Sequence, residues 1–242
     1  MRICILEADR PTPAQQDRFG SYADMFEAWL RPALPEAAFS RAFVAGGEAP
    51  PDAGAVDAVL ITGARAGVHD GAAWIADLAG HLRALRRQGT PMLGVCFGHQ
   101  LMAEAFGGRV ARASQGWTMG HHLHRPTAEG RAIFGDHDIG VMSCHQDQVT
   151  APPPGARVLI SYAASPHGGF AYDFAALSVQ FHPEFGADYV QSLLEGGLGV
   201  DMPEPFIRQI RSGLGAALHR DIIAQGFARF LRTAADVTGE RG

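Results

Sequence analysis

The stretch PMLGVCFGHQLMAEAFG, residues 91–107, decides the fold of this chain. It begins with the apolar run Met92–Val95, which predicts a short buried strand, and it ends in apolar residues at helical spacing. Between the two lies Gly94-Val95-Cys96-Phe97-Gly98, a cysteine version of the G-x-S-x-G nucleophile elbow. Glycines flank the cysteine because a Cβ would crowd the sharp turn from strand to helix.

The elbow motif leaves two interpretations of Cys96 open. As a nucleophile, it would sit at the carboxyl edge of a sheet, at a helix N-terminus, where the positive end of the helix favours a thiolate over a thiol. As a structural residue, it would be one of the many buried intracellular cysteines that behave as small apolar side chains. The motif alone does not decide between them, so the rest of the chain has to.

Composition excludes several classes of function. The chain has 242 residues, a net charge of −5, three cysteines, and neither lysine nor asparagine. Without lysine there is no Schiff base and no Walker A motif, and the charge gives no case for binding nucleic acid or an anionic membrane. We expect a single domain over residues 1–242, no signal peptide or membrane span, no metal or cofactor, and a reducing, cytoplasmic location with free thiols.

Strand and helix patterns alternate along the first half of the chain, which predicts a doubly wound parallel sheet. The expected strands are Arg2–Ala8, Ala38–Ala45 and Val56–Thr62, the expected helices run from Tyr22 to Trp29 and over Ala72–Gln88, and Arg10–Arg18 and Gly46–Gly54 are expected to be loops. After Gly108, short alternating segments predict antiparallel strands on the edge of the sheet or beside it: Arg109–Ser114, Met119–His124, Ile139–Ser143, Arg157–Ser161, Gly169–Tyr172 and Leu177–Gln180. A helix is expected over Asp221–Ala234.

A second stretch, LSVQFHPEF at residues 177–185, carries a base and a group to orient it. A strand here places His182 and Glu184, two residues apart, on the same face. An imidazole with a carboxylate beside it is the arrangement that activates a nucleophile. The pair lies 86 residues downstream of Cys96 and would complete a catalytic triad with it.

Four motifs together resemble the class I (triad) glutamine amidotransferase family, in the family's order and at about its spacing. They are ITGA at 61–64, CFGHQ at 96–100, SCHQDQV at 143–149 and VQFHPEF at 179–185. The resemblance implies a flavodoxin-like three-layer α/β fold, with a central, mostly parallel sheet and additional antiparallel edge strands. It also implies that Cys96 is the nucleophile, His182 the general base and then acid, and Glu184 the residue that orients His182.

The resemblance further implies which groups surround the substrate. The backbone N–H groups of Ala64 and Phe97 would form the oxyanion hole. The end of the substrate that carries the amino acid would be held by Gly63, Gln100, Cys144, His145, Gln146 and Asp147. The chain departs from the family at Gly63-Ala64-Arg65, where many members carry a small triplet such as Gly-Gly-Pro. Arg65 would then stand at the pocket lip, either binding a substrate carboxylate or pointing to solvent.

Three other candidates have structural explanations. His122 and His124 share one strand face, but without a Cys, Asp or Glu at suitable spacing we expect a solvated strand rather than a metal site. Cys144 has no flanking elbow glycines, so we expect no chemistry from its thiol. His99 is expected to be a packed helix residue rather than a base.

The sequence leaves three functions open. Residues 67–75 (GVHDGAAWI), with CFGHQ and Gly116-Trp117, are similar to a γ-glutamyl peptidase-like branch and to relatives of the GMP synthase amidotransferase domain. This favours a stand-alone hydrolase that acts on glutamine or a γ-glutamyl peptide through a γ-glutamyl thioester. The alternatives are a glutaminase subunit that delivers ammonia to a synthetase partner chain, and a catalytically idle binding protein on the same scaffold.

Overall fold

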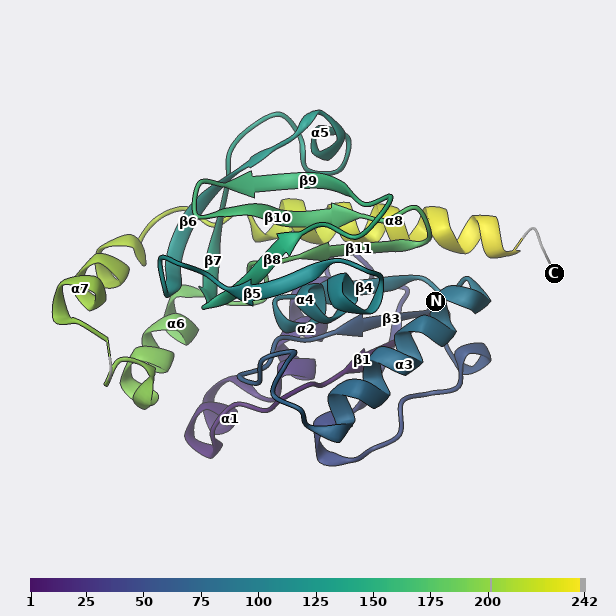
Figure 1. The fold of residues 1–242 in the computed structure, drawn as a ribbon, viewed down its shortest axis with the longest axis horizontal. Helices are drawn as coiled ribbons and strands as arrows, with labels where there is room; N and C mark the ends of the chain where they lie inside the picture. The colour runs from purple at the N-terminus through teal and green to yellow at the C-terminus, as the bar shows by residue number, and fades with distance from the viewer. Residues whose placement is uncertain (201, 240–242) are drawn as a thin grey trace.

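The computed structural model describes residues 1–200 and 202–239, in which nine strands form one mixed sheet (Figure 1). Their order across the sheet is β2-β1-β3-β4-β11-β10-β9-β6-β7. The parallel part consists of β1 (Arg2–Leu6), β2 (Ala38–Ala42), β3 (Ala58–Ile61), β4 (Met92–Val95) and β11 (Ala176–Val179). The antiparallel part consists of β6 (Thr118–Pro126), β7 (Ile139–His145), β9 (Arg157–Tyr162) and β10 (Ser165–Ala171).

The five parallel strands have the 2-1-3-4-5 order of a flavodoxin-like sheet. The strand order reverses between β1 and β3, and in such sheets ligands bind outside the carboxyl ends of the strands. β4 and β11 are adjacent and in register from Met92–Ala176 to Val95–Val179, so the residues that follow each strand emerge side by side. The expected α/β fold with a parallel centre and antiparallel edge is confirmed.

Helices cover both faces of the sheet and produce the expected three layers. On one face, α2 (Tyr22–Leu30) and α8 (Arg220–Gly239) enclose a core cluster with the strands. On the other face, α3 (Ala73–Gln88) and α4 (Phe97–Ala105) enclose a second cluster. Along α2, Phe26 and Trp29 are buried and pack into the first cluster.

A third apolar cluster forms where the chain returns after the last strand. It combines α6 (Ala187–Leu193), the π-helical turn Leu194–Leu198 and α7 (Glu204–Gly213) with residues from the start of α2. Two 3₁₀ turns, Val44–Gly46 and Ala53–Ala55, lie between β2 and β3. None of the helices in residues 1–200 and 202–239 combines the length and apolar character needed to cross a membrane.

Some sequence expectations need correction. The strand expected at Leu177–Gln180 among the antiparallel strands is β11, which lies inside the sheet, pairs in parallel with β4 and is buried throughout. The expected loop Arg10–Arg18 contains a helix, α1 (Pro13–Phe19), because proline is compatible with the first turn and the Gln15 side chain accepts from the Thr12 N–H at 3.1 Å. Among the elements not anticipated are α5 (Ala128–Phe134), and β8 (Asp147–Ala151), which pairs with β5 (Arg109–Arg112) beside the main sheet. The antiparallel strands therefore lie both at the edge of the sheet and next to it.

Candidate active site

The nucleophile elbow has the sharp turn that its glycines predict. Cys96 has φ +51°, a left-handed value found at no other non-glycine residue in the described part of the chain. A Cβ on Gly94 would lie 2.5 Å from Met102 Sδ, and one on Gly98 would lie 2.4 Å from the Ile61 carbonyl oxygen. The strand and helix can pack this closely only with glycine at both positions, and the turn leaves Cys96 at the N-terminus of α4.

His182 and Glu184 meet Cys96 because β11 lies next to β4. His182 Nδ1 is 2.7 Å from Glu184 Oε1, and the two side chains are 6% and 0% exposed. Burial disfavours the charged imidazole, but the attraction of Glu184 and of Cys96 outweighs it and raises the pKa of His182 to about 10. A buried imidazolium held between a carboxylate and a sulfur can donate a proton on the side of that sulfur, and the neutral imidazole it leaves can accept one.

Two residues that the sequence did not single out hold this pair in place. The Phe185 ring lies flat against the His182 ring, with centroids 4.0 Å apart. Arg220, at the start of α8, donates from Nε to the Pro183 carbonyl at 2.7 Å and from Nη2 to the Glu184 carbonyl at 2.8 Å. Arg220 reaches across more than thirty residues of sequence to make these bonds, and no local pattern could have predicted them.

The turn after β3 closes over the sulfur. A Cβ on Gly63 would lie 2.7 Å from His182 Cε1 and 3.6 Å from Cys96 Cβ, so Gly63 lies directly against both side chains. The backbone N–H groups of Ala64 and Phe97 make no hydrogen bond to any described residue. Free N–H groups on either side of a nucleophile are what an oxyanion hole requires.

Replacing Gly63 by alanine should therefore impair activity far more than stability. The new methyl group would push the His182 imidazole away from Cys96, and a misplacement of about 1 Å costs on the order of 10²-fold in rate. The measurement is kcat/KM together with the thermal unfolding midpoint. Gly215→Ala is the matched control, because its Cβ would have no atom within 4 Å. Full activity in Gly63→Ala would contradict the tight packing.

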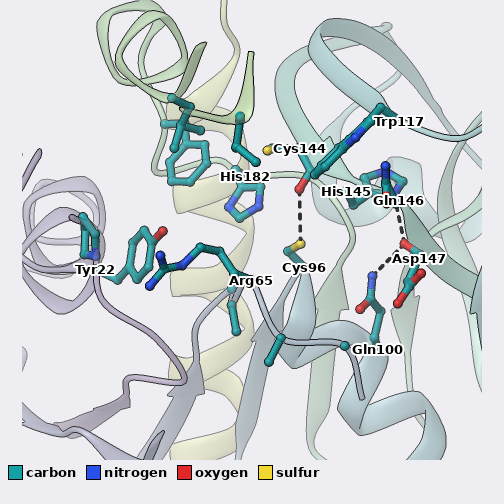
Figure 2. Close-up of a pocket in the computed structure, with 18 of the residues that line it drawn as sticks. Tyr22, Arg65, Cys96, Gln100, Trp117, Cys144, His145, Gln146, Asp147 and His182 are labelled. Carbon is teal, nitrogen blue, oxygen red and sulfur yellow. Dashed lines mark hydrogen bonds between the residues drawn. The ribbon is translucent and has the colours of Figure 1, made fainter. Parts of the chain in front are cut away.

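A cavity of about 850 Å³ opens in front of Cys96, and Figure 2 shows how its labelled residues divide into two sides. On one side, Gln100 Nε2 donates to the Asp147 carbonyl at 2.7 Å, and His145 Nδ1 donates to the same oxygen at 3.0 Å. The Cys96 thiol contacts the Cys144 carbonyl at 3.8 Å. All of the residues that the resemblance assigned to substrate binding line this cavity: Gly63, Gln100, Cys144, His145, Gln146 and Asp147.

The other side of the cavity carries Tyr22 and Arg65 (Figure 2). Arg65 donates from Nε and Nη2 to the two carboxylate oxygens of Asp9 at 2.8 and 2.9 Å, and its pairing with Asp9 raises the pKa of the guanidinium. Its side chain is 65% exposed. Arg65 thus does stand at the pocket lip, but Asp9, which the sequence did not single out, compensates its charge.

Three histidines in and around the site are buried and neutral. Burial lowers the pKa of His99 and His124 to about 3 and that of His145 to about 4. His99 is a packed helix residue, as expected. The expectation of a solvated strand at His124 is wrong, because Phe181 and Tyr162 pack against its ring and leave it 1% exposed.

In the described part of the chain, the sulfur and imidazole groups near Cys96 form neither a second reactive thiol nor a metal site. Burial, with Cys96 and Glu184 nearby, raises the pKa of the Cys144 thiol far above its ordinary value, so this thiol stays protonated. Among the described residues, no group of three or more His, Cys, Asp or Glu side chains has the geometry to hold a metal ion. The reactive groups therefore gather at Cys96.

The chain is similar in sequence to known proteins. The family model "Glutamine amidotransferase class-I" matches residues 48–193. A glutamine amidotransferase-like protein of Schizosaccharomyces pombe is 27% identical over 80% of this chain and 83% of its own length. GMP synthase of Thermus thermophilus is 37% identical over 52% of this chain, which is 27% of that enzyme. Gamma-glutamyl peptidase 3 of Arabidopsis thaliana is 27% identical over 61% of this chain and 62% of its own length.

Solved structures agree in fold. A glutamine amidotransferase from Thermotoga maritima superposes with a TM-score of 0.76 over 98% of both chains, at 18% identity. A glutamine amidotransferase from Methylobacillus flagellatus gives a TM-score of 0.74 over 98% of this chain and 94% of its own, at 17% identity. The family match covers more than half of the sequence, including the elbow and the His182–Glu184 pair. The chain belongs to the class I glutamine amidotransferase family.

Proposed function

We propose that this chain is a cysteine-triad hydrolase of γ-glutamyl amides that acts without a partner chain on glutamine or γ-glutamyl compounds. The observation that carries the proposal is the buried His182–Glu184 pair, 2.7 Å apart, beside a cysteine at a helix N-terminus that faces an open cavity. A buried ion pair of this kind is costly to maintain and has a clear use in activating a nucleophile.

The first half of the reaction releases the amine. The Cys96 thiolate attacks the γ-carbonyl carbon, a C–S bond forms, and the carbonyl electron pair moves to oxygen, where the N–H groups of Ala64 and Phe97 stabilise the negative charge. When the intermediate collapses, the C–N bond breaks and the His182 imidazolium gives its proton to the departing nitrogen. The products are a free amine, or ammonia from glutamine, and a γ-glutamyl thioester on Cys96.

The second half releases glutamate. Neutral His182 takes a proton from a water molecule, whose oxygen attacks the thioester carbon and forms a C–O bond. The C–S bond then breaks, which regenerates the thiolate beside the imidazolium. Glu184 keeps its charge throughout, holding His182 Nδ1 and stabilising the imidazolium.

Charges on the Gln100 side of the cavity suit an amino-acid zwitterion. Asp70 and Asp147 lie there, and a carboxylate oxygen of each is close to the point that a Cβ on Gly67 would occupy. Arg112 also lines the cavity and pairs with the Gln146 side-chain oxygen. Two carboxylates for the α-ammonium and one guanidinium for the α-carboxylate would orient a γ-glutamyl group with its amide at Cys96.

A second candidate is a glutaminase that delivers ammonia to a separate synthetase. The similarity to GMP synthase of Thermus thermophilus, 37% identical over 52% of this chain, favours it. The two candidates differ in whether the isolated chain hydrolyses glutamine or γ-glutamyl peptides rapidly without a partner.

The deciding experiment is glutamate release by the purified chain alone, from glutamine and from γ-glutamyl dipeptides. Rapid release would support the stand-alone hydrolase. Slow release that accelerates when a synthetase is added would support the glutaminase subunit. No release under either condition would overturn both, and would favour a binding protein.

Glu184→Gln is expected to lower kcat by about 10² to 10⁴-fold. The neutral amide removes the charge that raises the pKa of His182, and it can place an N–H against Nδ1, which favours the wrong tautomer. Activity of the native chain should decline above about pH 10 as the imidazolium deprotonates, and this alkaline limb should move to lower pH in the variant. The measurement is the pH–rate profile, and an unchanged alkaline limb would contradict the role given to Glu184.

A further inference from the structure

The cavity extends past Cys96 on the side away from Gln100 and Asp147, where Figure 2 places Tyr22 and Arg65. We name this part the amine arm; Gln15, Tyr22, Phe185, Leu193, Gly196 and Leu198 line it. The whole cavity, about 850 Å³, has the size of sites that hold drug-sized ligands, roughly 300–1,000 Å³. Glutamine fills the Gln100 side and would leave the arm empty, because its leaving group is ammonia.

The walls of the arm are mainly apolar. Tyr22, Phe185 and Leu193 belong to the third core cluster, and Leu198 packs against it as a partly buried side chain. The Tyr22 hydroxyl oxygen accepts from the Tyr189 hydroxyl at 3.3 Å, so this oxygen already has a partner inside the protein. A ligand group in this arm gains most by burying apolar surface.

The charge in the arm does not favour an anion. Arg65 is the cation there, and Asp9 occupies its Nε and Nη2, while the Arg10 carbonyl accepts a further bond from Nη2 at 3.3 Å. A ligand carboxylate at Arg65 would also lie beside the Asp9 carboxylate, which repels it. An amino acid or peptide as leaving group would bring such a carboxylate, whereas a simple amine would not.

We propose that the substrates are γ-glutamyl amides of arylalkyl amines, whose aromatic group occupies the amine arm during attack by Cys96. The inference rests on the proposed function, since it assigns the amine half of the same substrate. The C–N bond that breaks is the one described above, and the arylalkyl amine leaves with the proton from His182.

The test compares kcat/KM of the purified chain for glutamine, γ-glutamylethylamide, γ-glutamyl-2-phenylethylamide and γ-glutamylphenylalanine. The last two differ only in a carboxylate, which isolates the effect of charge. We expect γ-glutamyl-2-phenylethylamide to exceed glutamine by about tenfold or more, as burial of a ring predicts, and to exceed γ-glutamylphenylalanine by a similar factor. γ-Glutamylethylamide should lie between glutamine and the phenylethylamide.

Two variants test the arm through ratios of kcat/KM, which do not depend on the fraction of folded protein. Leu198→Ala should lower the ratio of phenylethylamide to glutamine about threefold, because it removes apolar wall. Asp9→Asn should raise γ-glutamylphenylalanine relative to the phenylethylamide, because Arg65 then has an uncompensated charge.

The outcomes distinguish failure of the arm proposal from failure of the proposed function. If glutamine or γ-glutamylphenylalanine is cleaved as well as the phenylethylamide, or if neither ratio moves in the variants, the arm proposal is overturned and the proposed hydrolase stands. If no γ-glutamyl compound is cleaved in a Cys96-dependent way, the proposed function and the arm proposal fall together.

Discussion

Cys96→Ala is expected to lower kcat/KM for every γ-glutamyl substrate by about 10⁴-fold or more, because removal of a nucleophile that acts as a unit with its base abolishes the covalent route. The fold should persist, since alanine at the elbow adds no atoms to a residue that is 4% exposed. The variant should also lower the pKa of His182, which Cys96 helps to raise. Glutamate release and NMR titration of the imidazole measure the two effects.

Cys4→Ala is the matched control for this prediction. Cys4 is buried in the second core cluster, away from the residues that line the cavity, so its loss should reduce stability and leave kcat/KM unchanged. Alkylation of the native chain by iodoacetamide should abolish turnover at the same rate as Cys96 is modified. Turnover that survives both Cys96→Ala and alkylation would refute the role of Cys96 as nucleophile.

Acid should unfold this protein well above the pH at which carboxylates alone would do so. The pKa values of the buried His99, His124 and His145 lie at about 3, 3 and 4, whereas the unfolded chain binds protons at histidine near pH 6.5. Between these values the unfolded state holds more protons, so stability falls as pH falls from about 6.5 to about 4. At pH 5 the loss is about 2 kcal/mol for each histidine, which together approaches a typical total stability of about 5–15 kcal/mol.

His182 does not offset this effect. Its pKa is raised to about 10, so below pH 6.5 it is protonated in both the folded and the unfolded protein. The stability that His182 contributes is therefore complete below pH 6.5 and is lost only as the pH rises toward 10.

The measurement is the free energy of urea unfolding at pH 7, 6 and 5. The unfolding free energy should fall less between pH 7 and pH 5 in His124→Phe, by about a third, because this variant lacks one of three buried neutral imidazoles. His137→Gln, at an exposed position, is the control, and an equal slope in all three proteins would refute the prediction.

How far the fold was predictable depended on the range of the interactions. Helices α2 and α3 have strong apolar periodicity and β1, β3 and β4 are short apolar runs, and the structure agrees with the sequence there. Strand β11 was expected among the antiparallel strands, because its short segment does not show that it pairs in parallel with β4. Helix α1 was missed because two prolines read as a loop, whereas Thr12 and Gln15 are helix-start residues. The burial of His124 was missed because a strand pattern does not tell which strand, here β9 with Tyr162, will cover a side chain.

The sequence by itself determined the elbow and the order of the elements. Those follow from local physics: glycine where a Cβ would collide, and apolar spacing that matches strand or helix. It also singled out Cys96, His182 and Glu184, whose catalytic roles stay a prediction until tested, but it did not show that β11 lies beside β4.

The surroundings of those groups depend on long-range contacts. The bond of Arg220 to the Glu184 carbonyl, the pairing of Arg65 with Asp9 and the walls of the amine arm join residues far apart in the chain. Such contacts depend on how helices settle against the sheet and against one another. No short stretch of sequence carries that information, because each partner has the same local pattern whether or not the other is near.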